Sequence, residues 1–135
     1  MRKHAIYIVG GLLSLGLPAV AFAAPRTFQE LSGIIVNLLN NAVAATSKAG
    51  EIEIVLACEE ERNVVILEVR DNGAGVSDQD KLRLFEPYFS RKKTGTGLGL
   101  AIASTVVADH HGYIRVKDNE PQGARFIIEL PLNNG

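Results

Sequence analysis

The first half of the chain changes from a helical to a strand period of apolar residues. Between residues 28 and 46 the apolar side chains recur three and four positions apart, which is the spacing of one helical face. This helix is expected to end near Gly50. Residues 51–60 then alternate apolar and polar side chains and predict a strand, with Ile52, Ile54, Leu56 and Cys58 on its apolar side. A polar turn leads into VVILEVRD at 64–71, a second strand that forms a hairpin with the first.

The second half repeats the order of a helix followed by two strands. DNGAGVS, starting at Asp71, is a turn, a short helix is expected over KLRLF, and a loop follows from Glu86 to Thr96. A second helix begins near Leu98, runs to His110 or His111 and has Gly112 as its stop. YIRVKD and ARFIIELP predict a closing hairpin, whose inward side chains are Ile114, Val116, Phe126, Ile128 and Leu130. This order predicts an α+β fold, an antiparallel sheet with helices layered on one face.

The N-terminal 24 residues have a different character. MRKH is basic, and the stretch from Ala5 to Ala24 carries no charge. With small residues at Ala21 and Ala23 it is typical of a secretory signal peptide, and it also approaches the ~20 residues that span a bilayer. We therefore expect a signal peptide or membrane anchor at 1–24, with membrane association through residues 5–24, and one folded domain at 25–135.

Charge and cysteine content exclude some classes of function. The chain of 135 residues has 14 basic and 15 acidic side chains and a net charge of −1, so nothing in the overall charge attracts nucleic acid. Its single cysteine, Cys58, excludes an intrachain disulfide and is expected to be a buried thiol of a strand.

Two asparagines on the first predicted helix are candidate binding residues. Asn37 and Asn41 are four positions apart and share a helical face next to the apolar stripe. They are either amides of the helix surface without a task or part of a site for Mg²⁺ and phosphate, since Mg²⁺ takes oxygen ligands. Asp71, at the end of a strand, begins a D-x-G-x-G turn with Gly73 and Gly75. Its carboxylate suits the exocyclic amine of adenine, although such turns are common.

The stretch TGTGLGLAIA places Gly95, Gly97 and Gly99 in front of the second helix. Glycine here costs backbone entropy, and a close approach of phosphate to the helix start is the first explanation. The pattern of the P-loop is absent, and no strand precedes the glycines as the Rossmann pattern requires.

The motifs NLLNNA, DNGAG, LFEPYFS and GTGLGLAIA follow one another in this order. Together they resemble the ATP-binding catalytic domain of two-component sensor histidine kinases, in the superfamily with gyrase, heat-shock chaperone and mismatch-repair ATPases. The resemblance covers residues 28–132, and the wording from Phe85 onward is similar to the nitrogen-regulation branch. It implies a two-layer α+β sandwich from which the family's first helix and strand are missing.

The resemblance also implies roles for single residues. Asn41 would ligate Mg²⁺, Asn37 would support the phosphates of ATP, and Asp71 would bind the adenine amine. The remaining residues implied to shape the adenine pocket, to form the lid or to face the phosphates are Gly73, Gly75, Phe85, Phe89, Lys92, Lys93, Gly95, Thr96, Gly97, Leu98 and Gly99. Ala44 and Arg125 depart from the family pattern, in which a basic residue and a Thr or Ser are frequent. The superfamily's hydrolases usually have a glutamate where Asn37 stands, and an amide cannot accept the proton of water.

None of the three histidines is followed by an acidic residue, as the family's phosphoacceptor histidine is. The resemblance therefore implies a phosphoryl donor whose partners are a helical hairpin that carries the acceptor histidine in trans and a response regulator. A second interpretation stays open, a non-catalytic exported or membrane-tethered remnant. An exported domain would meet little ATP, whereas an ATP site implies the cytoplasmic side of the membrane.

Overall fold

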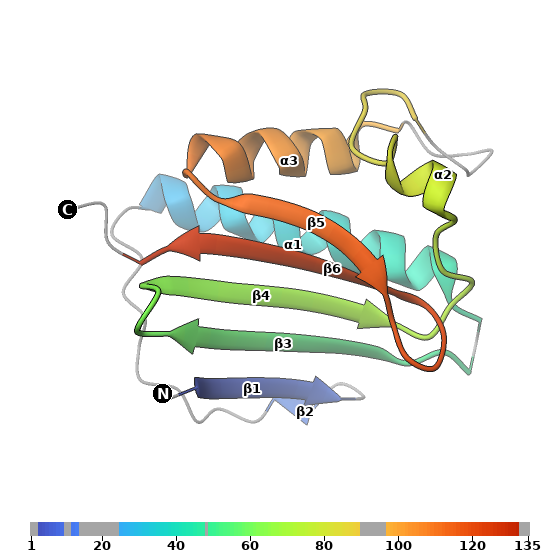
Figure 1. Cartoon of the computed structure of the whole chain (residues 1–135), viewed down its shortest axis with the longest axis horizontal. Helices are drawn as coiled ribbons and strands as arrows, with labels where there is room; N and C mark the ends of the chain where they lie inside the picture. Colours follow the sequence, from blue (N-terminus) through green and yellow to red (C-terminus); the bar gives the residue numbers. More distant parts are fainter. Residues whose placement is uncertain (1–2, 10–11, 14–24, 48, 90–96, 133–135) are drawn as a thin grey trace.

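The computed structural model describes residues 3–9, 12–13, 25–47, 49–89 and 97–132. Helices lie on one face of a six-stranded sheet with the strand order β2-β1-β3-β4-β6-β5 (Figure 1). All its neighbouring strands are antiparallel. The predicted α+β sandwich is confirmed, with elements β1 (Lys3–Val9), β2 (Leu12–Leu13), α1 (Pro25–Ala45), β3 (Ile52–Glu59), β4 (Val64–Asp71), α2 (Asp78–Lys81), α3 (Gly99–Asp109), β5 (Tyr113–Asp118) and β6 (Ala124–Pro131).

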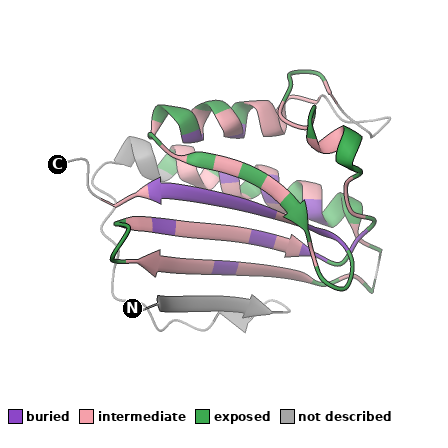
Figure 2. Cartoon of the chain, viewed as in Figure 1, coloured by how far each residue is buried: buried purple, intermediate pink, exposed green. Residues whose placement is uncertain are grey.

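The hydrophobic core lies between the sheet and helices α1 and α3. Leu38 of α1 and Val69 of β4 are fully buried, and β6 is buried along most of its length (Figure 2). Phe126, Ile128 and Leu130 face this core from β6, while Ile114 and Val116 of β5 pack against it, as the alternation predicts. Full burial of a large apolar side chain such as Ile128 contributes about 1.5–3 kcal/mol to folding.

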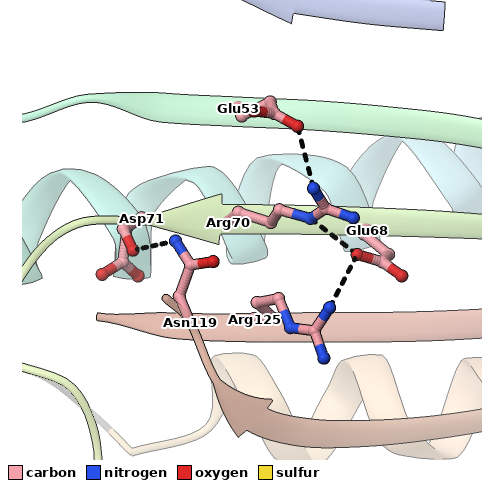
Figure 3. Close-up of polar contacts among 6 residues, drawn as sticks. All are labelled: Glu53, Glu68, Arg70, Asp71, Asn119 and Arg125. Carbon is pink, nitrogen blue, oxygen red and sulfur yellow. Dashed lines mark hydrogen bonds and ion pairs between the residues drawn. The ribbon is translucent and has the colours of Figure 1, made fainter. Parts of the chain in front are cut away.

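The opposite face of the sheet carries ion pairs. Arg70 of β4 binds Glu53 of β3 at 3.1 Å and Glu68 at 2.8 Å, and Arg125 of β6 approaches Glu68 to 3.9 Å (Figure 3). Towards the C-terminal end of β6, the buried Glu129 forms ion pairs with Arg62 and Arg115. The hydrogen bonds that Arg62 donates to Glu59 and Glu129 raise the pKa of its guanidinium above the usual value.

Three details of the helices differ from the sequence analysis. Helix α1 ends at Ala45 and not near Gly50. The short helix α2 covers Asp78–Lys81 and not the expected KLRLF, because Ser77 caps it by accepting the N–H of Asp80 at 3.1 Å. At the end of α3 the left-handed residue is His111, with φ of 60°, and not the expected stop Gly112. Gly112 serves a different need, since a Cβ there would lie 2.3 Å from the backbone oxygen of Glu129.

A strand lies ahead of the first helix, where the sequence analysis expects none. Strand β1 runs antiparallel to β3, from Lys3 opposite Glu59 to Val9 opposite Glu53. The β-branched and aromatic residues of AIYIV suit a strand, and β3 offers it an edge of backbone donors and acceptors. Within the described residues, no helix is both long and apolar enough to cross a membrane. The signal-peptide or anchor role of residues 1–24 stays a prediction.

Replacing Gly112 by alanine is expected to destabilise the fold by about 1–3 kcal/mol, because the new methyl group meets backbone. Gly33→Ala is the matched control, since a Cβ at this helical position has no heavy atom within 4 Å. The control is expected to raise stability by about 0.4–1 kcal/mol. Urea unfolding of the full chain measures both, and equal shifts in the two variants would contradict the proposed contact.

Candidate functional site

Most of the residues singled out by sequence meet at one end of the molecule. The C-terminal ends of α1 and β4 and the start of α3 lie together there (Figure 1). Asn37 of α1 reaches α3, and its Nδ2 donates a hydrogen bond to the backbone oxygen of Gly99 at 3.2 Å. Asn41 follows one turn later on the same helix and is half-buried. The first helix thus presents both amides beside the start of α3.

Asp71 is the last residue of β4 and is only 2% exposed. Its Oδ1 accepts hydrogen bonds from the backbone N–H of Gly73 at 2.9 Å and of Ala124 at 3.3 Å. Both of these hydrogen bonds are made to Oδ1. A buried carboxylate held in this way is suited to bind an amine specifically.

The glycines of the DNGAG turn are required for different reasons. At Gly73 a Cβ would lie 2.2 Å from the backbone oxygen of Ala45, the last residue of α1, and the neighbouring Ala74 donates to that oxygen at 3.3 Å. Gly75 instead has φ of +76°, a conformation that side chains disfavour. The turn is therefore seated on the C-terminal end of α1, one turn beyond Asn41.

The base of the expected lid is closed by backbone. Tyr88 donates to the oxygen of Gly97 at 2.9 Å, and Gly97 has φ of +72° with no room for a Cβ against Tyr88. Phe85 meets Phe126 edge to face at 6.5 Å between ring centroids. Phe89 lies under the guanidinium of Arg83 at 4.8 Å. Phe85 thus connects this segment to the core. The role of Phe85 and Phe89 as anchors of a lid over the nucleotide stays a prediction.

Lys92, Lys93, Gly95 and Thr96 lie outside the described residues. Leu98 and Gly99 are described at the start of α3, where the first backbone N–H groups of a helix have no partner within the helix. This end carries the positive end of the helix dipole and attracts anions. The start of α3 therefore suits the phosphate role that the sequence predicts for it.

The sequence analysis missed the contribution of the β5–β6 loop. Asn119 and Gln122 donate to backbone oxygens of the DNGAG turn, at 2.8 Å to Asp71 and 2.9 Å to Gly73. Gly123 has φ of +107° and lies so close that a Cβ would be 1.9 Å from the oxygen of Asp71. The loop's sequence, NEPQG, is typical of a hairpin connection. Nothing in it indicates a position beside the DNGAG turn.

Charged groups tie α2 to the same hairpin. Lys81 binds Asp118 of β5 at 2.8 Å and Asp78 at 3.0 Å. The hydrogen bonds that Lys81 donates to Asp118, and to a smaller extent to Asp78, raise the pKa of its ammonium group above the usual value. Within the part of the chain that the structure describes, no three His, Cys, Asp or Glu side chains gather as a metal site.

Comparison with known proteins identifies relatives of this arrangement. The family model described as histidine kinase-, DNA gyrase B- and HSP90-like ATPase matches residues 28–134. The sensor histidine kinase ZraS of Salmonella typhimurium is 39% identical over 104 residues, which cover 77% of this chain and 22% of ZraS. The C4-dicarboxylate transport sensor protein DctB of Rhizobium meliloti is 35% identical over 118 residues, 87% of this chain and 19% of DctB. The chain thus spans about a fifth of the length of these relatives.

Solved structures show the same fold. The mycobacterial sensor histidine kinase MprB aligns with a TM-score of 0.70 and 32% identity over 76% of this chain and 72% of the other. Full-length ShkA, solved in complex with AMPPNP, aligns with a TM-score of 0.66 and 34% identity over 76% of this chain and 21% of ShkA. The nitrogen-regulation branch is not singled out by these matches and stays a prediction.

Replacing Asn37 by alanine removes the hydrogen bond from α1 to Gly99. Asn40→Ala is the matched control, because Asn40 lies on the exposed side of the same helix and gains the same helix propensity. We expect the Asn37 variant to be less stable than the Asn40 variant by about 0.5–1.5 kcal/mol, the net worth of one hydrogen bond. Urea unfolding gives the difference, and equal stabilities would show that the contact contributes nothing.

Proposed function

The chain belongs to the histidine kinase-, DNA gyrase B- and HSP90-like ATPase family, and from this premise we propose that its ATP site is formed by Asn37, Asn41, Asp71 and the start of α3. The domain is the ATP-binding catalytic domain of the sensor histidine kinase type. In the proposal it binds Mg-ATP and presents the γ-phosphoryl group to a histidine outside this chain. The observation that carries the proposal is the carboxylate of Asp71, which is buried at the start of the DNGAG turn and binds the backbone of that turn.

The donor set fits Mg²⁺ bound through phosphate. Asn41 supplies an amide oxygen on the face of α1 that also carries Asn37, and no acidic cluster competes for the ion in the described part of the chain. Mg²⁺ commonly keeps water and phosphate ligands and takes few protein ligands. When bound, it would neutralise charge on the triphosphate. The chain's own contribution is to hold the phosphates against the N–H groups of α3.

The amide at position 37 favours phosphoryl transfer over hydrolysis. Asn37 donates from Nδ2 to Gly99, which keeps the start of α3 beside α1. An amide cannot accept a proton from an attacking water, so the site lacks a general base at this position. In the proposal, Asn37 positions the helix start that faces the phosphates and takes no part in activating water.

The partners follow from the same chemistry. A phosphoryl donor without an acceptor histidine requires a helical hairpin that carries one, and a response regulator would receive the phosphoryl group in turn. Matched relatives described as sensor histidine kinases support this assignment. They do not favour the alternative of a non-catalytic exported remnant.

Asp71→Asn is expected to weaken binding of Mg-ATP ten- to hundredfold. The asparagine retains one acceptor oxygen for the N–H groups of Gly73 and Ala124. Its amide NH₂ group, however, would face the amino group of adenine, and two donors cannot form a hydrogen bond with each other. Loss of such a charge-assisted hydrogen bond costs about 1.5–3 kcal/mol. Isothermal titration of the full chain measures the affinity, and Asp109→Asn, exposed at the far end of α3, is the control. Unchanged affinity would remove adenine recognition from Asp71.

The chain incubated alone with γ-labelled ATP is expected to acquire no acid-labile phosphate. His110 is bound to Glu30 at 2.7 Å. It also lies past the C-terminal end of α3, about 16 Å along the helix from its start at a rise of ~1.5 Å per residue. The chain could instead label itself and lose the label when His110 and His111 are both replaced by alanine. That result would contradict the proposal that the chain is a phosphoryl donor without an acceptor histidine of its own.

A further inference from the structure

The β5–β6 loop contacts the turn that bears Asp71 on the side next to β6. A cavity of about 770 Å³ opens on that side, lined by residues 50–53, 70–72 and 119–122. Side chains do not fill this space, so the turn gains little packing there. Its connections to the loop are hydrogen bonds and one backbone contact.

Three residues of the loop, Asn119, Gln122 and Gly123, make these connections. Asn119 Nδ2 donates to the oxygen of Asp71 at 2.8 Å (Figure 3), and Gln122 Nε2 donates to the oxygen of Gly73 at 2.9 Å. Gly123 lies in contact with the same oxygen of Asp71. The loop itself is closed by the backbone bond from Asn119 to Gly123 at 2.9 Å. Two side-chain amides therefore hold the backbone on both sides of the exposed Asn72.

On its other flank the turn is held by backbone and by Asn72. The N–H of Asn72 donates to Glu51 at 3.2 Å, and its side-chain oxygen accepts the N–H of Glu51 at 2.8 Å. Arg70, the residue before Asp71, is fixed by Glu53 and Glu68. The strand end is thus immobilised on the β3 side. On the β6 side, Asn119 and Gln122 hold the backbone of the turn, while the N–H of Ala124 binds the Asp71 carboxylate.

We infer that Asn119 and Gln122 are positioning residues for recognition of the nucleotide base. They set the place of the backbone at Asp71 and Gly73, and hence the direction of the Asp71 carboxylate towards adenine. This inference rests on the proposed function of Asp71. It assigns to the closing hairpin a part in base selectivity, in addition to its part in the sheet.

Near-isosteric substitutions without donors test the inference. Asn119→Leu and Gln122→Met keep the charge and the approximate size of the side chain but lose one hydrogen bond each. We expect each to weaken binding of AMPPNP by about three- to tenfold, the equivalent of one neutral hydrogen bond. Binding of the matching guanosine analogue, which offers Asp71 no 6-amino group, should hardly change. The ratio of the two affinities therefore falls, and a merely structural loss would leave that ratio unchanged.

Two further variants complete the experiment. Gln122→Lys restores a donor and is expected to recover most of the selectivity, while Glu120→Gln, exposed in the same loop, is the control. Titrations at 25 °C use the full chain, with folding checked by circular dichroism. An unchanged affinity ratio in the Leu and Met variants overturns the inference. Failure of the wild-type chain to bind AMPPNP overturns the proposed function with it, and an unchanged Asp71→Asn variant removes its premise.

Discussion

The hydrogen bonds to the carboxylate of Asp71 join segments that are far apart in the chain. Oδ1 receives N–H groups from its own turn and from Ala124, 53 residues later. The bond to Ala124 requires β6 to lie beside β4, and the turn requires the end of α1 beneath Gly73. Sheet order, helix docking and the candidate site are therefore coupled at one buried group. Burying a carboxylate is expensive, and these donors offset that cost.

Much of the fold follows from local pattern. The spacing of Ile34, Leu38 and Ala42 predicts the buried face of α1, and all three are buried. Alternation predicts β4, β5 and β6 with their ends correct. These predictions succeed because a helix or strand in a two-layer fold has one apolar face, and the period of that face is written in the order of residues.

The failures share a physical cause, since each depends on contacts between distant residues. Nothing in NEPQG indicates that Asn119 and Gln122 reach the turn after β4, because the register of β6 against β4 decides it. Gly112 reads as a helix stop, yet its need arises from the oxygen of Glu129 on a neighbouring strand. In the candidate site, the motifs of the sequence single out Asp71 and Asn37, but they do not indicate the bond from Asn37 to Gly99, which spans 62 positions.

The pairing of β1 with β3 has a consequence for the order of events during synthesis. Lys3 pairs with Glu59, so β1 leaves the ribosome long before its neighbour exists. At ~5–20 residues per second, the interval is roughly 3–11 s. Throughout it, the uncharged stretch that begins within β1 at Ala5 is available to any factor that recognises nascent apolar segments. Binding of such a factor then competes kinetically with pairing of β1 to β3. A slower elongation rate lengthens the interval and favours binding of the factor.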